Sequence, residues 1–193
     1  MQHQKIPDLN MSVVQGLLHN IGNFSNEEVQ LFSVRAIKRN FQKNDILLNE
    51  GDVCKSAFYI IYGEAFQFYY DDIDEQIIDL HVENDWCLNH ASFVTQKPST
   101  AIIKAYSDLT VLELTIQSVH ELVALSPSFF QLGSVLQQTV SRVQYFDNTN
   151  TAEEKHKQLF LSRPQLFQQF PLKMIASYLK IAPETLSRIR GKK

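Results

Sequence analysis

The sequence has few cysteines and no long apolar run, and both absences limit what the protein can be. Only Cys54 and Cys87 occur, with no CxxC pair and no cysteine–histidine spacing that would close a zinc site. No stretch of about 18 apolar residues offers a membrane span, and the N-terminus lacks the charged-then-apolar layout of a secretory signal. We therefore expect a cytoplasmic protein with reduced thiols, no metal and no membrane partner.

Catalytic motifs are missing as well. The histidines form no HxH or HExxH pattern, no serine sits in a nucleophile elbow, and the paired histidines of a cupin-like metal site are absent. The six histidines are scattered along the chain at His3, His19, His81, His90, His120 and His156. We expect a protein that is not an enzyme.

Composition and charge favour a folded protein with a basic C-terminal segment. Hydrophobic residues make up 44% of the chain and aromatic residues 11%, which is enough for a sizeable core. Residues 1–150 carry 9 basic and 18 acidic side chains, whereas residues 151–193 carry 9 basic and 3 acidic ones. This asymmetry indicates that the C-terminal segment meets a polyanion, although a lysine-rich frayed end would give the same count.

Residue patterns divide the chain into three parts. Two short helices are expected at 9–20 and 26–34, the second opened by the capping-box pair Ser25 and Glu28. Short β-type runs then extend from Ala36 to Thr115, with residues 66–70 and 76–80 as the clearest hairpin. We predict an α+β fold with a β-roll sensor domain over 1–125, a dimerisation helix and hinge over 126–150, and a DNA-binding domain over 151–193.

A long helix is predicted from Pro127 to Phe146. Its apolar stripe can bury itself against a second copy of the chain, or it can cover the open face of the roll, and periodicity alone leaves both open. The residues assigned to a homodimer are Leu132, Leu136, Val140 and Val143.

Residues 170–190 predict two helices joined by a tight turn, preceded by a helix that begins at Thr151 with Glu154 as its capping partner. Leu172, Ile175, Ala176 and Leu179 form the inner face of the first helix, and Ala182, Leu186 and Ile189 that of the second. Pro183 suits a first helical turn. A carboxylate and a guanidinium on the outer face can read cytosine and guanine, although Glu184 and Arg188 would also serve as an ordinary i, i+4 pair. The DNA-binding residues assigned are Pro183, Glu184, Ser187, Arg188, Arg190, Lys192 and Lys193.

This order of elements resembles the Crp/Fnr family of transcription regulators, and the ending IASYLKIAPETLSRIR is similar to the family signature IxxxLGxSxETVxR. The resemblance implies a cyclic-nucleotide-binding type of roll, a dimer helix and a second terminal helix that enters the major groove. Lys180 stands at the family's turn glycine, Ala182 at its Ser or Thr cap, and Pro183 at its frequent arginine. Because little sequence follows the second helix, we expect a truncated wing, as in a shortened branch of the family associated with Bacteroidetes.

The phosphate-binding cassette of that family keeps its frame here but not its chemistry. Leu88 and Asn89 stand at the glycine and glutamate, and Ser99 and Thr100 at the arginine and its neighbour. Because neutral hydroxyls cannot balance a cyclic phosphate, we expect no cyclic AMP and no other identified cofactor. Lys97 and His90 can attract an anion, but a surface lysine and a partly buried histidine are the simpler interpretation. The candidate effector pocket comprises Trp86, Leu88, Asn89, His90, Lys97, Ser99 and Thr100.

The sequence therefore predicts a dimeric regulator that binds palindromic double-stranded DNA. RNA polymerase and an unidentified small-molecule effector are its further candidate partners. The alternative is a ligand-binding or protein-interaction β-roll dimer whose helix-turn-helix has decayed.

Overall fold

The computed structural model describes residues 11–144 and 150–191, except for the side chains of residues 141–144. In chain order the elements are α1 (Met11–His19), α2 (Asn26–Arg35), β1 (Ile37–Phe41), β2 (Ile46–Leu48), β3 (Ser56–Tyr62), β4 (Ala65–Asp71), β5 (Asp74–His81), β6 (Trp86–Cys87), α3 (His90–Thr95), β7 (Ile102–Ala105), β8 (Leu109–Thr115), α4 (Ile116–Leu125), the 3-10 helix η1 (Pro127–Leu132), α5 (Gly133–Gln144), α6 (Ala152–Ser162), α7 (Leu166–Gln169), α8 (Leu172–Tyr178) and α9 (Pro183–Gly191). The α+β architecture expected from the sequence is confirmed.

Two four-stranded antiparallel sheets form the roll. Their strand orders are β1-β8-β3-β6 and β2-β7-β4-β5. The predicted hairpin is the β4–β5 pair, in which Asp71 faces Asp74 across a turn where Asp72 has a φ of 54°. Short-range alternation and an acidic turn were sufficient to predict it.

The helix starts follow the predicted capping chemistry. Ser25 opens α2 and Thr151 opens α6, each with its glutamate three residues later closing a complete capping box. The predicted helix from Pro127 is different at its beginning, because residues 127–132 form η1 and the α-helix starts only at Gly133. The helices α3 and α4 were not predicted from the sequence.

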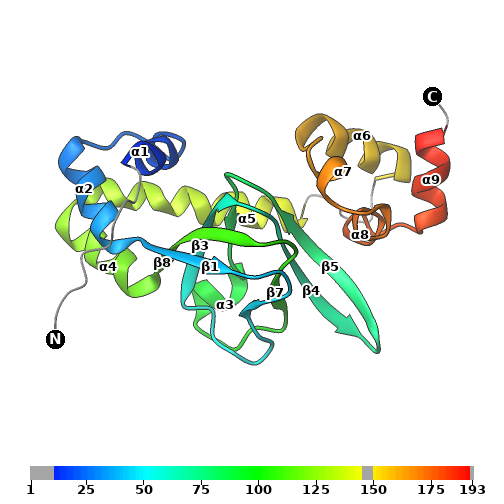
Figure 1. Ribbon diagram of the computed structural model, residues 1–193, viewed down its shortest axis with the longest axis horizontal. Helices are drawn as coiled ribbons and strands as arrows, with labels where there is room; N and C mark the ends of the chain where they lie inside the picture. The colour runs from blue at the N-terminus through cyan, green and yellow to red at the C-terminus, as the bar shows by residue number, and fades with distance from the viewer. Residues whose placement is uncertain (1–10, 145–149, 192–193) are drawn as a thin grey trace.

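Two apolar clusters organise the interior. The first joins the roll to α1, α2, α4, η1 and the start of α5. The second joins β4 and β5 to the C-terminal helices and includes Phe66, Phe68 and Leu80 from the hairpin side. Figure 1 shows the resulting arrangement, with α8 beside β5 and with α9 at the end of the molecule opposite α2. Within the described residues, no helix has the length and apolar character needed to span a membrane.

Candidate nucleic-acid interface

The turn between α8 and α9 is tight because one residue adopts a left-handed conformation. Lys180 has a φ of 55°, and its backbone N–H donates to the carbonyl of Ser177 at 3.0 Å. The N–H of Ile181 then donates to the carbonyl of Ala176, also at 3.0 Å. Lysine thus occupies the backbone conformation that favours glycine, so the substitution noted in the sequence changes the energy of the turn and leaves its geometry in place.

The inner faces of these helices agree with the predicted spacing at most positions. Ile175 and Ala176 from α8, and Leu179 at its C-cap, pack with Leu186 from α9 in a buried apolar cluster. Ala182, which we assigned to the inner face of the second helix, is instead exposed. It precedes the first helical residue, Pro183, so the helical period does not yet apply to it.

The outer face of α9 carries the predicted polar side chains in solvent. Glu184, Ser187, Arg188 and Arg190 are all exposed, and Pro183 is half-exposed at the start of the helix. The other two assigned residues, Lys192 and Lys193, lie outside the described residues. A short helix of this kind, with a carboxylate and two guanidinium groups facing outward, has the side chains that read base edges and contact phosphates.

Only part of the basic charge counted in the sequence faces solvent. Lys155 is buried within the C-terminal helices, and the Arg163 side chain is almost buried against the roll. The basic residues of this part that the structure places in solvent are Lys157, Lys173, Lys180, Arg188 and Arg190. The charge available to a polyanion is therefore smaller than the sequence count indicates, and it is concentrated around α8 and α9.

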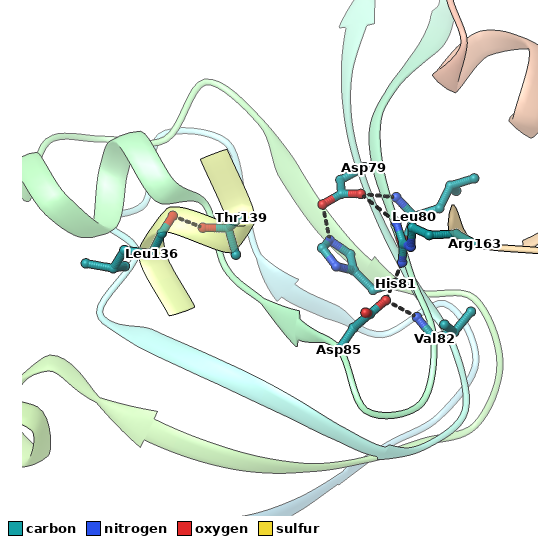
Figure 2. Close-up of polar contacts among 8 residues, drawn as sticks. All are labelled: Asp79, Leu80, His81, Val82, Asp85, Leu136, Thr139 and Arg163. Carbon is teal, nitrogen blue, oxygen red and sulfur yellow. Dashed lines mark hydrogen bonds and ion pairs between the residues drawn. The ribbon is translucent and has the colours of Figure 1, made fainter. Parts of the chain in front are cut away.

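Arg163 attaches the C-terminal helices to β5 through a buried polar network (Figure 2). Its guanidinium forms an ion pair and hydrogen bond with Asp85, lies 3.5 Å from Asp79, and donates to the carbonyl of Leu80 at 2.9 Å. Asp79 and His81 are each 1% exposed, and the His81 Nε2 lies 3.8 Å from an Asp79 oxygen. Burial lowers the pKa of Arg163, but the negative charges of Asp85 and Asp79 outweigh it and hold that pKa above its usual value.

Apolar and backbone contacts continue this junction along the hairpin. The Ser177 hydroxyl accepts a hydrogen bond from the N–H of Ile77 at 3.0 Å, and the rings of Tyr106 and Phe170 lie 5.0 Å apart. These contacts hold α8 against β5 and leave α9 on the side away from the roll (Figure 1). This junction was not predicted from the sequence, although Asp79 and His81, an aspartate and a histidine at alternate positions of one strand, were a signal for it.

The cassette residues are used within the fold. The Asn89 side chain caps α3 by accepting a hydrogen bond from the N–H of Ser92 at 2.9 Å. The Ser99 hydroxyl donates a hydrogen bond to the Ala101 carbonyl and accepts one from the Ala101 N–H. Leu88 and Trp86 are buried, His90 is half-buried, and Lys97 and Thr100 are exposed. Asn89 and Ser99 are therefore engaged within their own segment, and Lys97 and Thr100 face solvent. The structure describes no cluster of three metal-ligating side chains in residues 11–144 and 150–191.

The described part of α5 turns much of its apolar stripe toward the roll. Leu132 is 6% exposed and belongs to the roll's core with Val135, and Leu136 packs partly against the same cluster. Thr139 is buried, with its hydroxyl donating to the Leu136 carbonyl at 2.8 Å (Figure 2). Leu132 is thus already covered within one chain, which favours the second of the two interpretations at that position. Val140 stays half-exposed, and the side chain of Val143 lies outside the described residues.

Comparisons with known proteins agree with this architecture. Residues 38–126 match the family described as the cyclic nucleotide-binding domain, and no curated protein matches the sequence. Among solved structures, FixK2 from Bradyrhizobium japonicum aligns over 81% of this chain and 83% of its own, with 15% identity and a TM-score of 0.66. The Catabolite Activator Protein of Thermus thermophilus aligns over 91% and 84%, with 17% identity and a TM-score of 0.57.

A third neighbour, the global regulator CLP of Xanthomonas campestris, aligns over 87% of this chain and 91% of its own, with 16% identity and a TM-score of 0.59. Residues 38–126 thus form a domain of the cyclic-nucleotide-binding type. Over most of its length the chain has the fold of Crp/Fnr regulators. The resemblance stated from the sequence is confirmed at the level of domain and fold.

Proposed function

We propose that this protein is a cytoplasmic, dimeric transcription regulator that binds double-stranded DNA through α9. The observation that carries this proposal is the exposed face of α9, which follows the tight turn after α8. The side chains on this face that are exposed to solvent are Glu184, Ser187, Arg188 and Arg190. Base-edge readout requires them exposed on a helix at the surface of the molecule.

The experiment that tests DNA binding is retention on DNA-cellulose at low salt. The wild-type protein should be retained and should elute as salt rises, because counterion release makes such binding salt-dependent. Arg188→Glu should elute early. Lys38→Glu, which reverses an exposed charge on β1 far from α9, is the matched control and should elute with the wild type. Passage of the wild type through the column at low salt would contradict the proposal and favour the decayed-module alternative.

The dimer is proposed along the part of α5 that the roll does not cover. Val140 and the outer part of Leu136 remain available there, with Val143 expected to extend the same stripe. Two-fold symmetry would place two half-sites about one helical turn, roughly 34 Å, apart on the DNA. Sedimentation equilibrium should give twice the chain mass at micromolar concentration, and a monomer under these conditions would contradict this part of the proposal.

We also propose that the roll does not sense cyclic AMP, although its domain family is named for cyclic nucleotides. A phosphodiester in a partly closed pocket needs an ionised donor or several aligned N–H groups. Asn89 and Ser99, at the positions where the resemblance puts the glutamate and arginine, already bond within the chain, and Lys97 is an exposed turn residue. These contacts support the proposal that the polar side chains of the cassette stabilise its fold and do not bind a nucleotide.

A further inference from the structure

A cavity with an almost entirely apolar lining lies beside the cassette and includes Trp86 and, from α3, Phe93. It has a volume of about 430 Å³, opens to solvent on one side, and is lined by residues of β3, β6, β8, α3, α4, η1 and the start of α5. The side chains that define its chemistry are Trp86, Phe93, Val119, His120, Phe129 and Leu136. Of the seven candidate effector residues only Trp86 lines it, whereas Asn89 and Ser99, the positions where the resemblance puts the glutamate and the arginine, do not.

The lining selects against charge. Among the described residues that line the cavity, His120 is the only one with an ionisable side chain, and it is exposed on α4. An anion or cation entering this cavity would lose its hydration without an opposite charge to replace it. An apolar molecule would instead gain contacts with aromatic rings, which offer stacking and edge-to-face surfaces. The volume falls within the range of about 300–1,000 Å³ that is typical of small-molecule sites.

We propose that this cavity binds an uncharged, largely apolar small molecule that carries at most one hydrogen-bonding group. Such a ligand would touch Phe93 on α3 and Leu136 on α5 at once. It would therefore connect the helix that Asn89 caps to the helix proposed for dimerisation. That this ligand acts as an effector of DNA binding rests on the proposed function. Binding of the ligand to the cavity does not depend on that function.

The chain contains its own reporter for this site, because Trp86 is its single tryptophan and lines the cavity. The probe is N-phenyl-1-naphthylamine, an uncharged apolar fluorophore that accepts excitation energy from tryptophan. Titration should quench Trp86 emission with a saturable rise in probe emission, at one probe per chain. The same titration on free tryptophan amide gives the baseline for collisional quenching.

Two variants place the binding in this cavity. Ala124→Phe adds a ring to an exposed alanine of α4 that lines the cavity, and it should weaken probe binding at least tenfold. Ala91→Phe adds the same ring to an exposed alanine of α3 outside the lining, and it should leave binding within twofold of wild type. If Ala124→Phe unfolds early, Gly133→Leu fills the cavity from α5, where an added Cβ meets no neighbour. Gly16→Leu on α1, equally open, is its control.

Three outcomes would overturn the proposal. They are absence of saturable binding to the wild type, equal weakening by a filling variant and its control, and a probe signal that falls as protein concentration rises through self-association. The last result would show that a second copy of the chain covers the cavity. Repeating the DNA-cellulose assay with the probe separates the two proposals, since a protein that binds probe but not DNA would retain the cavity site and lose the regulator function.

Discussion

The roll and the C-terminal helices use polar side chains in opposite ways. In the cassette of the roll, Asn89 and Ser99 turn inward and bond to the backbone of their own segment. On α9, Glu184 and Arg188 turn outward into solvent. Both segments depart from the family pattern that they resemble, yet one has its polar groups engaged within the fold and the other leaves them available. The orientation of polar groups, more than the match to a motif, separates a structural segment from a binding one.

Arg163 is the exception that joins the two regions, so its replacement should have the largest effect. Arg163→Met leaves the buried Asp79 without this cation and should cost about 3–5 kcal/mol of unfolding free energy, measured by urea denaturation. Arg39→Met removes an exposed ion pair with Glu113 and should cost no more than about 1 kcal/mol. Adding Asp79→Asn to Arg163→Met should recover part of the loss. Similar losses for the two arginine variants would show that Arg163 is not a buried partner.

On the outward-facing side, Arg188→Ala should weaken binding to the preferred duplex by about 1–3 kcal/mol and relax base preference at one position. The reason is that a guanidinium can fork onto guanine, whereas in the proposed complex the lysines at the C-terminal end would contact phosphates. Replacement of Lys192 or Lys193 should weaken all duplexes alike and lower the salt dependence. Fluorescence anisotropy measures both effects. An unchanged ratio between preferred and scrambled duplexes in Arg188→Ala would remove that residue from base readout.

The turn at Lys180 offers a smaller effect of opposite sign. Lys180→Gly should stabilise the protein by about 1 kcal/mol, because the residue has a positive φ that costs a lysine more than a glycine. Lys180→Ala keeps that cost and should not stabilise, which separates geometry from charge. Gln96→Gly, at a φ of 53° after α3, relieves the same backbone cost but also removes the hydrogen bonds that the Gln96 amide donates to the carbonyls of Cys54 and Phe93, so it should stabilise less than Lys180→Gly. Thermal unfolding that ranks Lys180→Ala with Lys180→Gly would contradict this account.

For cyclic nucleotides we expect no effect at all. Isothermal titration with cyclic AMP or cyclic GMP should give no saturable heat, because Asn89 and Ser99 are engaged within the cassette. Saturable binding near micromolar Kd that Ser99→Ala or Thr100→Ala abolishes would reverse the comparison and make the cassette a nucleotide site.

Short-range signals explain what the sequence could predict. The capping pairs at Ser25 and Thr151, the β4–β5 hairpin and the spacing of α8 each depend on residues a few positions apart. The contacts of Arg163 were out of reach, because its partners lie about 80 residues earlier and only folding brings them together. Leu132 shows a second limit: an apolar stripe fixes which face of a helix is buried, but not whether the roll or a second chain buries it.

The central claim is that α9 reads DNA, and selection from a pool of random duplexes tests it most directly. The wild-type protein should enrich a palindromic sequence with half-sites one helical turn apart, and should bind it at least about 1,000-fold more tightly than a scrambled duplex at physiological salt. Ser187→Ala and Arg188→Ala should shift the enriched bases within each half-site. Equal affinities for enriched and scrambled duplexes, or enrichment that neither substitution changes, would contradict the assignment of α9 as the recognition helix.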